Sequence, residues 1–168
     1  MARIVIFGNS GSGKSTLAKS LARLDHAEHL DLDLIAWKKE EPGVRAAFAD
    51  SRSELLRFIE KSNAWVIEGC YSELLKVAAA HCTELIFLNP GVEACVENCK
   101  ARPWEPHKYS TVEAQDKNLR MLIGWVREYE TRDDEFSLRE HRKVFDSHEG
   151  RKVEYRSNTE AQRRLNQL

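Results

Sequence analysis

Residues 8–15 read Gly8-Asn9-Ser10-Gly11-Ser12-Gly13-Lys14-Ser15, and this stretch decides the fold. It fits the pattern G-x-x-x-x-G-K-[ST] at every fixed position. The glycines allow the backbone to curl so that successive N–H groups point at one anion, and the positive end of the following helix points to the same place. We therefore expect a phosphate-binding loop, in which Lys14 reaches the β- and γ-phosphates of ATP or GTP and the Ser15 hydroxyl binds Mg²⁺.

The flanking sequence has the pattern that such a loop requires. An apolar stretch at residues 4–7 predicts a buried strand directly before the loop, and residues 14–23 predict a helix directly after it. The alternative, a glycine-rich loop without a ligand, does not account for this context. The expected nucleotide contacts are Gly8, Asn9, Ser10, Gly11, Ser12, Gly13, Lys14, Ser15 and Thr16.

Apolar runs alternate with helical patterns along the rest of the chain, which predicts a single α/β domain of 168 residues with a mostly parallel sheet. The remaining expected strands are residues 28–33, 64–67, 85–88 and 152–155. The remaining expected helices are residues 44–62, 90–102 and 134–147, with two more that open at the capping boxes 110–113 and 157–160.

Composition excludes several classes of protein. Lys plus Arg number 26 and Asp plus Glu 27, so the net charge of −1 gives no general attraction to nucleic acid or to anionic membranes. No apolar run approaches the ~18 residues of a membrane span, and the apolar start of the chain is too short for a signal peptide. We therefore expect a cytoplasmic protein with reduced cysteines, although Cys95 and Cys99, one helical turn apart, leave a metal pair as a less favoured alternative.

Polar side chains stand where three predicted strands end. Asp31 and Asp33 end the second strand, where residues two apart point the same way, so we expect both carboxylates to face the phosphate site. Glu68 follows the third strand and Asn89 the fourth, and ligands of parallel sheets bind at these ends. We expect Asp33 to accept a hydrogen bond or a proton from a substrate hydroxyl, and Glu68 and Asp31 to support Mg²⁺. The simpler alternatives are a turn residue for Asp33, solvated carboxylates for Asp31 and Glu68, and a helix cap for Asn89, which we favour.

Together with the loop, two further stretches resemble small bacterial P-loop kinases of the adenylate-kinase-like or "DNA topology modulation" group, whose wider relatives are shikimate, gluconate and nucleoside monophosphate kinases. These stretches are Leu32-Asp33-Leu34-Ile35-Ala36-Trp37 and Trp65-Val66-Ile67-Glu68-Gly69-Cys70-Tyr71-Ser72. The resemblance implies a sheet of five parallel strands in the order 2-3-1-4-5, a monomer, and a lid at about residues 102–118. It also implies that Asp31 and Asp33 touch Mg²⁺ and the acceptor. Glu68 and Asn89 depart from the group, which usually has aspartate at the first position and often at the second.

The lid of such a kinase brings positive charge to the transferred phosphoryl group and excludes water. Arg102 and Lys108 flank a stretch broken by two prolines, PWEPHKY, and Arg120 and Arg127 share a face of the next helix. We expect Arg102 and Arg120 to contact phosphate; the alternative is a solvated helix face.

The acceptor is expected to lie beyond the ends of the second and third strands. Its expected contacts are Asp33, Trp37, Glu68, Gly69 and Tyr71. For Trp37 and Tyr71, core packing is the equal alternative. Three arginines of the predicted helix 44–62 are placed either to hold the phosphate of a nucleotide acceptor or to face solvent: Arg45, Arg52 and Arg57.

The sequence thus predicts a kinase that binds ATP and Mg²⁺ and phosphorylates an unidentified small molecule. The expected catalytic residues are Lys14, Asp33, Arg102 and Arg120. The main alternative is a regulatory protein that binds ATP with slow or no phosphoryl transfer. An NTPase that acts on nucleic acid is the third alternative, and the charge balance does not favour it.

Overall fold

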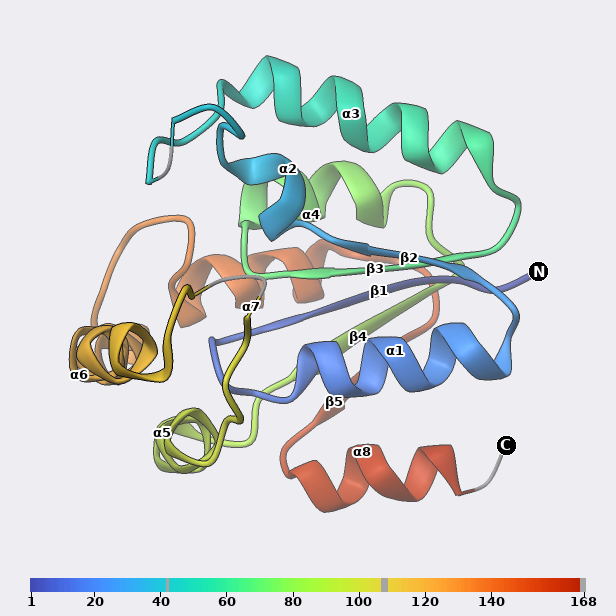
Figure 1. Ribbon diagram of the computed structural model, residues 1–168. Helices are drawn as coiled ribbons and strands as arrows, with labels where there is room; N and C mark the ends of the chain where they lie inside the picture. Colours follow the sequence, from blue (N-terminus) through green and yellow to red (C-terminus); the bar gives the residue numbers. More distant parts are fainter. Residues whose placement is uncertain (42, 107–108, 167–168) are drawn as a thin grey trace.

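One parallel sheet forms the centre of the computed structural model, which describes residues 1–41, 43–106 and 109–166 (Figure 1). Its strands lie in the order β2-β3-β1-β4-β5, so the predicted fold class and the strand order implied by the resemblance are confirmed. The strands are β1 (Arg3–Gly8), β2 (Glu28–Asp31), β3 (Trp65–Gly69), β4 (Glu84–Leu88) and β5 (Lys152–Tyr155). The three central strands are almost wholly buried and mostly apolar, because helices cover both faces of the sheet.

Helices pack on both faces of the sheet (Figure 1). On one face, α1 (Lys14–Leu24) and α8 (Asn158–Leu165) bury an apolar layer against the sheet. On the other face, α3 (Phe48–Lys61), α4 (Ser72–Ala79) and α7 (Leu138–Ser147) bury a second and larger layer. These two layers hold the sheet in place, and the strand ends between them carry the candidate site.

A third, smaller apolar cluster joins α5 (Val92–Lys100) to α6 (Val112–Arg127), which continues into the 3₁₀ turn η1 (Glu128–Glu130). In Figure 1 this pair lies at the edge of the sheet where β1 ends. The connection between α5 and α6 and the first turns of α6 make up the expected lid segment, residues 102–118. Of the residues in this connection, His107 and Lys108 lie outside the described part of the chain.

The second strand is shorter than predicted. It ends at Asp31, and Asp33 begins a one-turn helix, α2 (Asp33–Ala36). The reason is local, since Asp31 Oδ1 accepts a hydrogen bond from the Asp33 N–H at 2.9 Å, and this turn takes the chain out of the extended conformation. The prediction that residues 28–33 form one strand, with both carboxylates on one side of it, is therefore wrong.

Three predicted helices begin later than expected, among them the helix expected at 134–147, which begins at Leu138, and the helices α2 and α4 were not predicted. The helix expected at 44–62 begins at Phe48, and Arg45 instead pairs with Trp37 in an isolated antiparallel bridge. The helix expected from Pro90 begins at Val92, and the Asn89 amide donates to Glu154 Oε1 at 3.0 Å, so the capping interpretation of Asn89 is wrong. Helix α4 was not predicted because it has only eight residues and its first turn has no side-chain cap.

Side-chain caps open the last three helices. The hydroxyls of Thr111, Ser137 and Ser157 each accept a hydrogen bond from the N–H three residues later. The capping box at 157–160 is thus confirmed, and the helix predicted from the box at 110–113 begins one residue late. None of the helices in the described ranges is both long enough and apolar enough to cross a membrane.

Candidate active site

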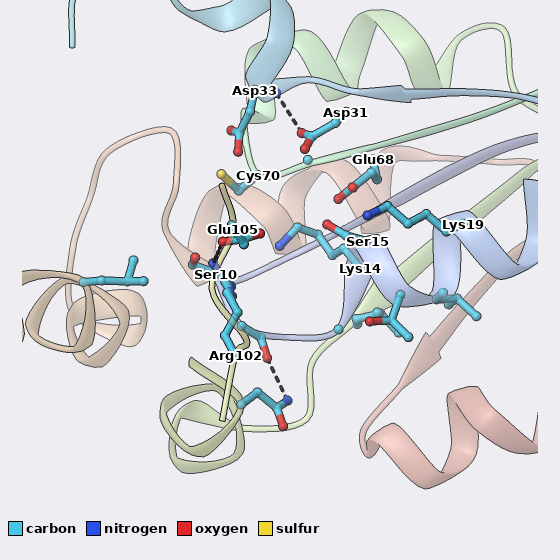
Figure 2. A pocket seen from close by; sticks show the side chains of 18 of the residues that line it. Ser10, Lys14, Ser15, Lys19, Asp31, Asp33, Glu68, Cys70, Arg102 and Glu105 are labelled. Carbon is cyan, nitrogen blue, oxygen red and sulfur yellow. Dashed lines mark hydrogen bonds and ion pairs between the residues drawn. The ribbon is translucent and has the colours of Figure 1, made fainter. Parts of the chain in front are cut away.

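A cavity of about 1020 Å³ opens where β1, β2 and β3 end, between the phosphate-binding loop, α6 and α8 (Figure 2). Parallel sheets bind their ligands at this edge. The structure brings most of the predicted site residues to this cavity. Its wall includes Ser10, Gly11, Gly13, Lys14, Ser15, Thr16, Asp31, Asp33, Trp37, Glu68, Gly69, Tyr71 and Arg102. Three predicted nucleotide contacts, Gly8, Asn9 and Ser12, are buried within the loop and do not line the cavity.

The glycines of the loop permit its conformation. Gly11 and Gly13 have φ angles of 77° and 96°, which side chains rarely adopt. A Cβ atom on Gly11 would also lie 2.4 Å from the Cys95 carbonyl oxygen and 2.7 Å from Cys99 Sγ, on the neighbouring α5. The buried cysteines of α5 therefore pack against the loop, and only glycine fits between them.

Two asparagines tie down the carbonyl groups of the loop. Asn98 Nδ2 donates to the Gly11 carbonyl and Asn158 Nδ2 to the Ser12 carbonyl, both at 2.8 Å. Asn98 Nδ2 also lies 3.0 Å from Asn158 Oδ1, so one amide network spans α5, the loop and α8. Because these bonds hold the carbonyl groups, the loop keeps the curvature that turns its N–H groups toward an anion. Neither residue could be identified from the sequence, since asparagine on a helix carries no signal for this role.

Lys14 is buried, and its side chain lies inside the curve of the loop. Its ammonium group donates to the Asn9 carbonyl at 2.7 Å, within the curve where a phosphate would lie. The Asn9 side chain points the other way and donates to the Val126 carbonyl at the end of α6. A bound phosphate would therefore compete for a lysine that the loop already holds in position.

Glu68 lies at the end of β3, is 2% exposed, and points toward Lys14 and Ser15 (Figure 2). Burial raises the pKa of its carboxyl group, but contact with His29, the charge of Lys14 and the Ser15 hydroxyl outweigh burial and hold the pKa below its ordinary value. Glu68 is thus an ionised carboxylate in a buried place. Its Oε1 atom has no hydrogen-bond partner, and His29 Nε2 lies 3.5 Å away.

This donor set fits a magnesium ion that arrives with a nucleotide. Mg²⁺ prefers oxygen ligands and is usually held by one or two protein oxygens together with water and phosphate oxygens. The orphaned oxygen of Glu68 and the Ser15 hydroxyl are such atoms, and Asp31 pairs in register with Glu68 on the adjacent strand. Within the described residues, no three His, Cys, Asp or Glu side chains are grouped to hold a metal.

We call the part of the cavity lined by residues 31, 33, 37, 45, 69–71, 125 and 136 its acceptor half. It contains a chain of hydrogen bonds. Trp37 Nε1 donates to Tyr71 Oη at 2.8 Å, and the Tyr71 hydroxyl donates to Asp33 Oδ1 at 2.5 Å. Burial and the Asp33 charge raise the pKa of Tyr71 far above its ordinary value, so the phenol keeps its proton. The Asp33 carboxylate is therefore oriented by a fixed donor.

Arg45 also lines the acceptor half, in a way that the predicted helix did not suggest. Its guanidinium group lies over the rings of Trp37, Tyr71 and Phe136, at 4.7–5.5 Å from their centroids. Arg45 Nη2 also pairs with Glu135 Oε1 at 3.1 Å. The other two arginines considered for this role, Arg52 and Arg57, are exposed on α3 and do not line the cavity.

A buried relay holds the loop that carries Cys70 and Tyr71. His141 is fully buried, and its Nε2 lies 2.8 Å from the Cys70 carbonyl and its Nδ1 2.8 Å from the Tyr129 hydroxyl. A carbonyl only accepts, so Nε2 carries the proton and Nδ1 accepts from Tyr129. Burial lowers the pKa of His141 to about 4, and burial raises the pKa of the Cys70 thiol to about 12. Neither Tyr129 nor His141 was predicted to have a role at the site.

The two lid arginines occupy different places. Arg102 lines the cavity near Ser10 (Figure 2), and its Nη1 lies 3.5 Å from Glu105 Oε2. Arg120 is exposed on α6 and lies outside this cavity, beside a separate depression that it shares with Arg127. Arg102 is thus brought together with the phosphate-binding loop, whereas Arg120 is not.

Comparison with known proteins identifies a family and solved structures with the same fold. A family model described as "AAA domain" matches residues 4–120, which is more than half of the chain and includes the phosphate-binding loop, Asp33 and Glu68. A search of curated proteins found no match. Among solved structures, a shikimate kinase from Aquifex aeolicus is 22% identical with a TM-score of 0.53, and the alignment covers 98% of this chain and 94% of that chain.

Two further solved structures share the architecture. A gluconokinase from Sinorhizobium meliloti is 19% identical with a TM-score of 0.50, and the alignment covers 99% of this chain and 93% of that one. A protein from Thermus thermophilus is 17% identical with a TM-score of 0.57, and the alignment covers 98% and 93%. The fold is therefore that of small P-loop kinases, in agreement with the resemblance seen in the motifs. By its family match, the chain belongs to the AAA domain family.

Proposed function

We propose that the protein is a kinase that transfers the γ-phosphoryl group of Mg·ATP to a hydroxyl group of a small molecule. One observation carries this proposal: a single cavity joins the phosphate-binding loop to the Asp33–Tyr71 pair. A site built only to bind a nucleotide has no need of an oriented carboxylate across the cavity. The names of two structures with the same fold, a shikimate kinase and a gluconokinase, support a small-molecule acceptor.

The nucleotide would bind along the loop. Lys14 exchanges the Asn9 carbonyl for β- and γ-phosphate oxygens, and the N–H groups at the start of α1 bind the same phosphates. Ser15 and Glu68 would hold Mg²⁺, which neutralises charge on the phosphates when bound. Glu68 is suited to this because it is already ionised and has an unsatisfied oxygen.

The acceptor hydroxyl would lie between Asp33 and the γ-phosphate. Its oxygen attacks the γ-phosphorus while the bond from that phosphorus to the bridging oxygen breaks, and the electron pair leaves with ADP. The hydroxyl proton passes to the Asp33 carboxylate. Tyr71 contributes by holding this carboxylate in one orientation, since it donates to Oδ1.

Arg102 would stabilise the negative charge that spreads over the transferred group. It stands beside Ser10 on the lid connection, at the nucleotide side of the cavity (Figure 2). Closure of this connection over the nucleotide would exclude water, which favours the acceptor hydroxyl over hydrolysis. We include in the proposal a single domain spanning residues 1–168, acting as a monomer in the cytoplasm; sedimentation and cell fractionation test the last two statements.

The test is ADP production from Mg·ATP against a panel of nucleosides, nucleoside monophosphates, shikimate and sugar acids. The Lys14→Ala variant is the negative control, and Lys61→Ala, an exposed lysine at the end of α3, is the matched control. Stimulation by one acceptor that is lost in Lys14→Ala and kept in Lys61→Ala supports the kinase. ATP binding with no stimulation by any acceptor would instead support the alternative, an ATP-binding regulatory protein.

A further inference from the structure

Four aromatic side chains line the acceptor half of the cavity, and we call them the aromatic wall: Trp37, Tyr71, Trp125 and Phe136. They come from four separate segments, next to α2, α4 and α7 and on α6. Phe136 meets its neighbours edge-on, with ring centroids 5.3 Å from Tyr71 and 5.5 Å from Trp125. Trp37 remains 38% exposed, so part of this wall is open to a ligand.

Arg45 is the cation of the acceptor half, and the protein itself already matches its charge. Glu135 Oε1 lies 3.1 Å from its Nη2, the Ala36 carbonyl accepts from its Nε at 3.1 Å, and three rings of the wall flank the guanidinium. A phosphate or carboxylate on the acceptor would have to compete with Glu135 for this arginine. The arrangement makes Arg45 part of the wall's support rather than a receptor for an anion.

Carboxylates also line the acceptor half. Asp31 and Asp33 line the same part of the cavity as the aromatic wall, and Tyr71 of the wall donates a hydrogen bond to Asp33 Oδ1. An anionic group held there would lie close to like charges in a partly buried space, which lowers its affinity. A neutral group with a flat ring would gain stacking on the wall without this repulsion.

We infer that the acceptor is an uncharged alcohol that carries a flat ring, such as a nucleoside, rather than a phosphate ester or a carboxylic acid. The ring stacks on the aromatic wall, and a hydroxyl group lies at Asp33. This inference rests on the proposed function and names the substrate class of the same site. The γ-phosphoryl group moves from ATP to that hydroxyl, with the same bonds formed and broken as in the proposed function.

The first experiment compares matched pairs on the full chain. Thymidine, cytidine and guanosine are each measured against their 5′-monophosphates, with gluconate and shikimate as anionic comparisons that lack an aromatic ring. Binding is measured by equilibrium dialysis in the presence of Mg·ADP, and turnover by ADP release. We expect at least one nucleoside to bind roughly ten-fold or more tightly than its monophosphate and to stimulate ADP release.

Two variants test the structural basis, each with a matched control. Phe136→Leu removes a ring of the wall and should weaken nucleoside binding about ten-fold, whereas Phe145→Leu, outside the cavity, should not. Glu135→Gln releases Arg45 and should shift the preference toward the monophosphate by about ten-fold. Glu128→Gln, which instead removes one of the carboxylate partners of Arg132, should leave the preference unchanged.

The outcomes separate this inference from the proposed function. ADP release stimulated by a monophosphate or a sugar acid, but by no nucleoside, overturns the inference and leaves the kinase intact. Nucleoside binding without ADP release for any acceptor overturns the kinase and keeps the ring-binding site. If no acceptor binds and none stimulates ADP release, both the inference and the kinase are overturned. If Phe136→Leu binds nucleosides as tightly as the wild type, the aromatic wall does not hold the ring and the inference is overturned.

Discussion

The nucleotide half of the cavity, formed by residues 8–16 with Asn98 and Asn158, is built differently from the acceptor half. In the nucleotide half, consecutive backbone groups carry the binding chemistry, and glycines make their geometry possible. In the acceptor half, side chains from segments up to about a hundred residues apart meet, and hydrogen bonds and rings hold them together. The first half depends on one local sequence, whereas the second depends on the packing of the whole domain.

The largest effect is expected from a substitution that distorts the backbone of the nucleotide half. Gly11→Ala adds a Cβ at a φ of 77°, 2.4 Å from the Cys95 carbonyl oxygen, so the loop cannot keep its curve. We expect ATP affinity, measured by calorimetry, to fall on the order of 1000-fold or more. Gly124→Ala is the control, because no atom lies within 4 Å of its added Cβ and it stabilises a helix by up to about 1 kcal/mol. Unchanged ATP affinity in Gly11→Ala would refute the backbone account.

The next effect concerns acid stability of the acceptor half. His141 has a pKa of about 4 in the fold against 6.5 unfolded, so between these values the unfolded chain binds the extra proton. The contribution of His141 to the free energy of unfolding is therefore fully present above pH 6.5. The free energy of unfolding falls by about 3 kcal/mol as the pH drops toward 4.

Urea unfolding at several pH values checks this prediction. His141→Gln should lose this part of the pH dependence, whereas His81→Gln, at an exposed position, should keep it. Equal pH slopes in wild type and His141→Gln would show that the buried histidine does not couple to acid stability.

A third effect tests the electrostatics of the nucleotide half. Glu68→Gln removes an ionised, buried carboxylate that faces Ser15, and we expect Mg²⁺-dependent turnover to fall roughly 100-fold. ATP binding without Mg²⁺ should change much less. Glu28→Gln, at the exposed start of β2, is the control. Equal losses with and without Mg²⁺ would assign Glu68 to loop structure instead.

The smallest effect separates the two lid arginines. Arg102 lines the cavity, so Arg102→Ala should lower kcat about 30-fold in the acceptor-stimulated ADP assay. Arg120 lies on an exposed face of α6 outside the cavity, so Arg120→Ala should stay within about two-fold of wild type. A large loss in Arg120→Ala would mean that α6 turns toward the nucleotide when the lid closes.

Sequence reasoning succeeded where the signal is local. The phosphate-binding loop, the buried strands and the capping residue at 157 all depend on near neighbours, and the structure has them where predicted. It failed at the end of the second strand, where a local turn intervenes, and at two element ends that distant groups decide. Asn89 is drawn to Glu154 on β5 rather than to its own helix, and Arg45 is held by Glu135 and three rings instead of continuing a helix.

By itself, the sequence determined the α/β class and the loop that curls around a phosphate, because glycine spacing and apolar periodicity act over a few residues. The strand order followed only from the resemblance to known kinases. Tertiary structure alone decided the aromatic wall, the Asp33–Tyr71–Trp37 chain, the asparagine ties on the loop and the His141 relay. The physical reason is that each of these joins side chains whose separation in the chain has no fixed relation to their separation in space.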